Sequence, residues 1–148
     1  MGNSVAIGVA YQDQDLKGSS TVYAAATTGQ IGYNTGSATT APPSVTQATS
    51  KSTGVTINAS VGQIVTNNAA LAAGAEVAFV VTNSAISAYD IPVIAIASGA
   101  ATAGTYLVSV AAVAAGSFTI VITNASTGSL SEALTFNFAT IHVAQAWT

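Results

Sequence analysis

Few side chains in this sequence could carry out chemistry, and the first two are acidic. Asp13 and Asp15 stand two residues apart, so an extended backbone would place both carboxylates on one side, where they could begin a calcium site. Calcium needs about six to eight oxygen ligands, and no further acidic cluster follows. We interpret the pair as a solvated turn before Gly18, and we predict neither a metal site nor a cofactor.

His142 is the only histidine, and it stands between Ile141 and Val143 near the end of the chain. A catalytic triad combines a nucleophile, a base and an acid that orients the base. The acidic residues are scattered along the sequence, so their spacing gives this arrangement no support. We interpret His142 as an exposed or interface histidine and predict that the chain is not an enzyme.

The composition favours a subunit of a regular assembly. Charged residues make up 5% of the 148 residues, whereas a soluble domain has about 25%. The net charge is -3 and the chain has no arginine, which argues against binding to nucleic acid because phosphates attract clustered cations. It also has no cysteine, so a disulfide framework and a thiolate metal site are excluded.

The charge-free stretch from Ile91 to Ser131 is the part that could suggest a membrane span. Gly99, Gly104 and Gly116 divide it into pieces of strand length, and its apolar residues follow a period of two. The first residues also lack the basic region and apolar run of a signal peptide. We therefore predict no membrane role.

The elements that must position any site are strands, and the clearest pair runs from Ala103 to Asn124. Two strands are predicted here, joined by the turn 114–117. Alternation places one set of large apolar side chains on one face of the pair. This set is Tyr106, Val108, Val110, Phe118, Ile120 and Ile122.

Strand patterns recur from Ser44 onward at the spacing of an all-β sandwich. We predict strands near 45–49, 53–58, 62–66, 75–82, 91–97, 104–111, 117–123 and 132–143. The fold class is an antiparallel β-sandwich, jelly-roll-like, with an extended N-terminal arm. In the last strand Phe136 and Phe138 share one phase while Ile141 and Val143 share the other, and a bulge near Ala139 or Thr140 would reconcile them.

Residues 1–43 form the predicted arm, and residues 44–148 form the sandwich domain. The arm is rich in Gly, Ser, Thr and Ala, and cannot bury enough apolar surface to offset its ordering entropy. A disordered tail is the alternative to an arm that crosses a neighbouring subunit. The alternating residues Val5, Ile7, Val9 and Tyr11 favour the arm, and with Trp147 they are our candidate interface residues.

The sequence also contains an internal similarity. Residues 71–74 and the strand after them resemble residues 113–116 and the strand after those, and each strand leads to an asparagine, Asn83 or Asn124. We interpret the copies as equivalent strands in the two sheets of the sandwich, and chance similarity is the alternative.

Three further stretches carry a family resemblance. They resemble a module of tailed-bacteriophage structural proteins, and the similarity covers about residues 46–143. The stretches that carry it are 46–58, then 62–66 with 68–74, and finally 113–118 with 128–134, which runs into 137–139. Residues 10–15 also resemble the start of phage virion proteins. What this resemblance implies is a virion component without catalytic residues.

The expected function is capsid decoration. On this reading the protein is a cement protein on the outer capsid surface that binds the major capsid protein, associates with itself as a homotrimer and stabilises the shell. The alternative is a phage fibre or tail-spike domain that binds host-surface glycan. A filament or pilin-like subunit is also compatible, since the arm could be a donated strand.

Overall fold

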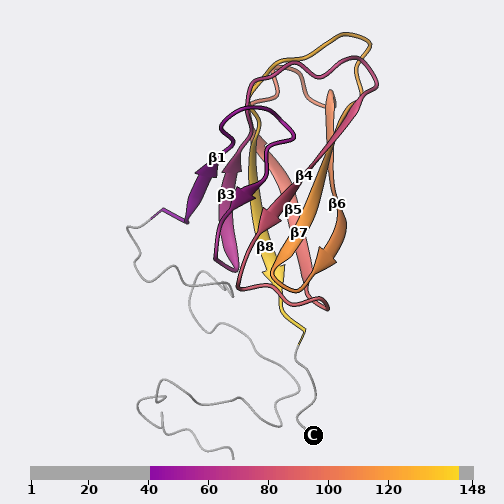
Figure 1. Cartoon of the computed structure of the whole chain (residues 1–148). Helices are drawn as coiled ribbons and strands as arrows, with labels where there is room; N and C mark the ends of the chain where they lie inside the picture. Colours follow the sequence, from indigo (N-terminus) through magenta and orange to yellow (C-terminus); the bar gives the residue numbers. More distant parts are fainter. Residues whose placement is uncertain (1–40, 144–148) are drawn as a thin grey trace, which may run out of the picture. The chain divides into compact units, whose positions relative to one another are not determined.

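A computed structural model describes residues 41–143 of the chain, and these residues form a β-sandwich. Its strands are β1 (Ser44–Thr46), β2 (Val55–Thr56), β3 (Val61–Val65), β4 (Glu76–Thr82), β5 (Ile91–Ser98), β6 (Tyr106–Ala114), β7 (Ser117–Asn124) and β8 (Thr135–Ile141). Sheet A has the order β1-β3-β8-β5, and sheet B has the order β2-β4-β7-β6. The two sheets pack face to face (Figure 1).

The period of two predicted these strands well. Each predicted segment overlaps one observed strand, and the predicted turn joins β6 to β7, with Gly116 at a φ of 81°. A positive φ costs glycine little because it has no Cβ. The all-β sandwich is therefore confirmed. The predicted arm at 1–43 lies almost entirely outside the described residues. Between residues 41 and 143 there is no helix with the length and hydrophobicity to cross a bilayer.

The prediction of purely antiparallel sheets was wrong, because both sheets are mixed. β1 pairs with β3 in parallel, and β2 pairs with β4 in parallel. Each of these pairs is separated along the chain by a strand of the opposite sheet, so no hairpin forces the two partners to run in opposite directions. The remaining pairings are antiparallel.

The core lies between the sheets and uses the predicted faces. Phe118 of β7 packs against Phe138 of β8, with ring centroids 5.6 Å apart and planes tilted by 54°. This geometry suits the ring quadrupoles, and burying each ring contributes about 2–3 kcal/mol. The other most buried apolar side chains are Ile64, Phe79, Val81, Tyr106, Ile120, Ile122, Leu134 and Phe136.

The predicted bulge in the last strand is absent. β8 pairs in continuous register with β3 through Ala139 and with β5 through Ile141. Thr140 points inward in phase with Phe138, and Ile141 is exposed. The register irregularities instead lie between Ile96 and Ser98 of β5 and between Val110 and Ala112 of β6. Both are edge strands, where an extra residue disrupts one ladder, whereas a bulge in β8 would disrupt two.

The two similar segments are neighbours in one sheet, which corrects their predicted assignment to different sheets. β4 and β7 pair antiparallel, and each follows a glycine of positive φ, 67° at Gly74 and 81° at Gly116. The backbone N–H of Asn83 donates to the Gly116 carbonyl at 2.9 Å, and that of Asn124 donates to the Ala75 carbonyl at 2.9 Å. The two copies therefore support each other at opposite ends of the same ladder.

Candidate functional site

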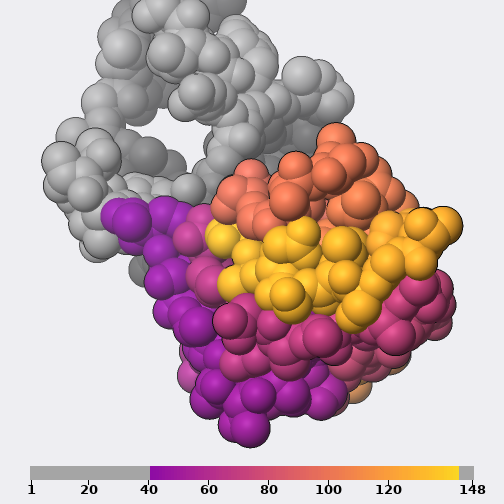
Figure 2. Space-filling model, turned by 90° about the horizontal axis from the view of Figure 1, so that it is seen from above, coloured from indigo at the N-terminus to yellow at the C-terminus, as the bar shows by residue number. Residues whose placement is uncertain are grey.

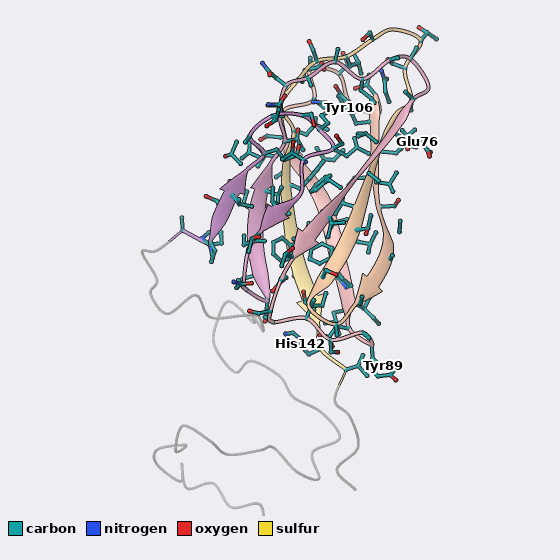
Figure 3. The ribbon with its side chains drawn as sticks, viewed as in Figure 1. Glu76, Tyr89, Tyr106 and His142 are labelled. Atoms are coloured by element: carbon teal, nitrogen blue, oxygen red, sulfur yellow. The ribbon has the colours of Figure 1, made fainter. Side chains whose placement is uncertain are left out.

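The sheet topology brings three chemically active side chains to one end of the sandwich. Ser60 directly precedes β3, Asp90 directly precedes β5, and His142 directly follows β8. Because β8 runs antiparallel to both β3 and β5, its C-terminal end lies beside the first residues of both neighbours, with Ala139 opposite Val61 and Ile141 opposite Ile91. Figure 3 shows His142 and Tyr89 at this end, and Tyr106 at the other.

A chain of hydrogen bonds joins the three residues. The carboxylate of Asp90 accepts from His142 Nδ1 at 2.9 Å and from the backbone N–H groups of Ser87, at 2.8 Å, and Val143, at 2.9 Å. The backbone N–H groups of Ser87 and Val143, with the imidazole, hold the pKa of Asp90 well below its usual range despite its burial. With Nδ1 donating to this carboxylate, Nε2 of a neutral imidazole accepts from Ser60 Oγ, at 2.8 Å.

This connectivity is that of a nucleophile, a base and an orienting acid, and it can move a proton from Ser60 Oγ to His142. The expectation that the acids are too scattered to serve His142 was therefore wrong for Asp90. Acyl transfer also needs donors that stabilise the developing oxyanion. Next to Ser60, the N–H of Ala59 is already donated to the Ile57 carbonyl at 3.2 Å, and the Ser60 carbonyl accepts from Thr140 at 2.8 Å. The bond from Thr140 to Ser60 ties the end of β8 to the start of β3, and the bonds from His142 and Val143 to Asp90 tie it to the segment before β5.

Exposed apolar side chains surround this hydrogen-bond chain, and we call them the apolar end patch. The patch consists of Tyr89, Ile91, Val93, Ile141 and Val143, which are between 44% and 66% exposed. Ile91 of β5 and Ile141 of β8 are partners in the ladder. The patch contains five of the seven large exposed apolar side chains in the described residues, the others being Val80 and Leu107 of sheet B.

No lysine or carboxylate of residues 41–143 is exposed within the apolar end patch, and His142, whose side chain is 40% exposed between Ile141 and Val143, is paired with Asp90. Asp90 is buried beneath it, and Glu76 lies toward the other end with Tyr106 (Figure 3). Lys51 and Glu132 meet each other, since Lys51 Nζ donates to the Glu132 carbonyl at 2.6 Å. The patch can therefore dock without burying an unpaired charge.

The Tyr106 end of the sandwich is fastened by a buried polar cluster. Lys51 Nζ also donates to the Asn67 carbonyl at 2.5 Å, and Tyr106 Oη donates to Glu132 at 2.7 Å. Burial lowers the pKa of Lys51 and, with the hydrogen bond to Glu132, raises the pKa of Tyr106 to about 12. The hydrogen bond from Tyr106 lowers the pKa of Glu132. Figure 2 shows this end closed by loops, with the loop after β7 between the segments before β4 and after β5.

The site differs from the one predicted from sequence. Val5, Ile7, Val9, Tyr11 and Trp147 lie outside the described residues, as do Asp13 and Asp15. Within residues 41–143 no group of three or more His, Asp or Glu side chains could hold a metal ion.

The apolar end patch was missed because a bulge was predicted to bring Ile141 and Val143 into phase with Phe136 and Phe138. The hydrogen-bonded triplet was missed because its members are 30 and 52 residues apart, which no local motif links. The exposed phase of Ile91 and Val93 on an edge strand was the available signal. Comparison of the chain with protein-family models, with curated proteins and with solved structures finds no match.

Proposed function

We propose that this chain is a tailed-bacteriophage capsid decoration protein that binds the outer surface of the head and stabilises the shell. The observation that carries the proposal is the apolar end patch, a cluster of exposed apolar side chains without lysine or an exposed carboxylate at one end of the sandwich. The low charge of the chain and the resemblance of residues 46–143 to a phage structural module support it. The partners are the major capsid protein and further copies of the chain, as a homotrimer.

The mechanism is mechanical. Burying an exposed Ile or Val side chain completely contributes about 1.5–3 kcal/mol, and the patch residues are about half exposed, so each adds about 1 kcal/mol on docking. A stable interface buries about 1,600 Å² in total, so the patch is the centre of a larger contact. Repeated copies on a symmetric shell add avidity without new contacts. The strand pairing supports a jelly-roll-like arrangement, since β6 pairs with β7 and β5 pairs with β8 as in a rolled hairpin.

The hydrogen bonds of Asp90 and His142 fit this role as a brace. They fix the end of β8, which carries Ile141 and Val143, against the start of β5, which carries Ile91 and Val93. A fixed patch loses little conformational entropy when it docks. We propose that the three polar residues hold the docking surface in shape and do not perform catalysis.

Cosedimentation with phage heads that lack this protein tests the role. Val93→Asp places a charge in the apolar end patch, and Val80→Asp is the matched control, because Val80 is also exposed, at 47%, but lies on β4 of sheet B. We expect saturable binding by the wild type and by Val80→Asp, and at least about tenfold weaker binding by Val93→Asp. Absence of binding by the wild type would refute the decoration role, and equal binding by the two variants would refute the docking surface.

A fibre or tail-spike domain that binds host-surface glycan is the second candidate, and one observation favours it. Tyr89 is an aromatic side chain, 66% exposed, at the tip of the sandwich, where its ring could stack on a sugar. Binding to host cells that is lost in Tyr89→Ala, together with no binding to heads, would select this alternative.

A further inference from the structure

The sandwich is less well covered along one side than along the other. The inward-facing apolar side chains of the central strands β7 and β8, such as Ile120, Ile122 and Phe136, are fully buried. On the edge strands β5 and β6 the inward-facing side chains other than Pro92 and Tyr106 are only partly buried, although they pack against the same core. These are Ile94, Ile96, Val108, Val110 and Val113. Since β5 and β6 are in contact along one side of the sandwich, this side has room for further apolar cover.

The backbone of β6 is also open to pairing. β6 is nine residues long, has β7 as its only strand partner in the described residues, and contains no charge and no proline. Natural edge strands are usually protected against pairing by charged side chains, prolines, bulges or short length. β5 has Pro92 and a register irregularity between Ile96 and Ser98, and β1 and β2 are only three and two residues long. β6 has one irregularity, between Val110 and Ala112, and none of the other protections, so it is the least protected of the four edge strands.

We propose that residues 5–11 of a second copy of this chain pair with the free edge of β6. Val5, Ile7 and Val9 alternate with Ala6, Gly8 and Ala10, so one face of the added strand is large and apolar and the other is small. The large face covers the partly buried side chains of β5 and β6, and the small face points outward. Neither residues 1–12 nor residues 91–131 contain a charge, so the contact buries none.

The lengths of the two segments agree, since seven extended residues span about 23 Å and pair with most of the nine residues of β6. Every copy carries both the donor segment and the acceptor edge, so head-to-tail donation links successive copies, into a closed ring where the rotation between copies closes and into an open filament where it does not. The strand addition does not rest on the proposed decoration role, because it concerns contacts between identical chains alone.

The experiment compares two full-length variants that differ in the face they alter. Ile7→Asp puts a charge on the apolar face of the donor segment, and Ala6→Asp puts the same charge on its small face. Sedimentation equilibrium measures the mass of each chain, and hydrogen exchange measures the protection of the backbone amides of residues 106–114. Because all changes lie outside residues 41–143, the sandwich itself stays intact.

We expect the wild type and Ala6→Asp to form oligomers with protected β6 amides. Ile7→Asp should be monomeric, with exchange at the free β6 amides at least about tenfold faster. The proposal is overturned if the wild type is monomeric with fast exchange along β6, or if the two variants behave alike. Protected β6 amides in a monomer would also overturn it, because they would place the segment on its own chain.

Discussion

Replacing Asn124 by alanine should be among the most destabilising single changes of a polar residue in the sandwich. Its side chain is fully buried at the end of β7. The amide nitrogen donates to the carbonyls of Leu71 at 2.9 Å, Ala72 at 3.1 Å and Gly128 at 2.8 Å. The amide oxygen accepts from the N–H and the hydroxyl of Ser126 at 2.9 and 2.7 Å. Alanine removes these five hydrogen bonds, although the Leu71 carbonyl keeps the bond from the Leu130 N–H and the Gly128 carbonyl keeps the bond from the Ser126 hydroxyl.

The size of the effect follows from those contacts. A hydrogen bond contributes about 1 kcal/mol net, and an unsatisfied buried group costs about 1–3 kcal/mol. The Gly128 carbonyl lies in an exposed loop where water can replace the amide, so we expect a loss of about 3 kcal/mol for Asn124→Ala. Asn83 is the matched comparison, because it ends β4 in the equivalent way but makes fewer bonds, donating to Ala59 at 2.7 Å and accepting from Ala85 at 2.9 Å. Asn83→Ala should cost about 2 kcal/mol.

Urea unfolding of the full chain measures both losses. With an m-value of about 2 kcal/mol/M, Asn124→Ala should lower the midpoint by about 1.5 M and Asn83→Ala by about 1 M. Asn137→Ala is the control, since Asn137 is exposed and its side chain bonds to Gln63 at 3.0 Å, and it should cost less than about 0.5 kcal/mol. A cost below about 1 kcal/mol for Asn124→Ala, or one smaller than that of Asn83→Ala, would refute the reasoning.

Three further predictions concern the ends of the sandwich. The lowered pKa of Asp90 stabilises the fold above the ordinary carboxyl pKa of 3.8, and this stability is lost as the pH falls toward the pKa of the folded state. The difference in unfolding free energy between wild type and Asp90→Asn should therefore shrink below about pH 4. A difference that stays constant with pH would contradict the prediction. Gly99→Ala should lower the unfolding free energy by more than about 2 kcal/mol, because Gly99 has a φ of 100° and an added Cβ would also clash with the Ala133 carbonyl oxygen. Gly104→Ala should cost about 1 kcal/mol, since Gly104 has a φ of 82° but open space around it. Equal losses of the two variants in thermal unfolding would show that the backbone contact is unimportant. Ser60 should not be labelled by a fluorophosphonate, as checked by intact mass, and labelling that disappears in Ser60→Ala would make the site catalytic.

The longer strands, such as β4 and β7, could be predicted because their alternating pattern depends only on neighbouring residues. The parallel pairings of β1 with β3 and of β2 with β4 could not be predicted, since β1 and β2 are too short for their sequence to specify a partner. The phase of β8 was misassigned because Ile141 and Val143 are as hydrophobic as core residues, and hydrophobicity alone does not tell a buried face from a docking face. The meeting of Ser60, Asp90 and His142 depends on the order of strands in sheet A, which no local pattern contains.

The place of β8 between β3 and β5 has a consequence for how the chain folds. Until this last strand is made, β5 has no partner in sheet A, and β3 can pair only with β1. In sheet B, β6 and β7 are adjacent in sequence and form a local hairpin. Pairings between distant segments are slow to form, so we expect the β6–β7 hairpin to form early and the pairings of β8 to form last. A chain that stops before Thr135 should therefore leave β5 unpaired, which the amide protection of β5 in such a chain would test.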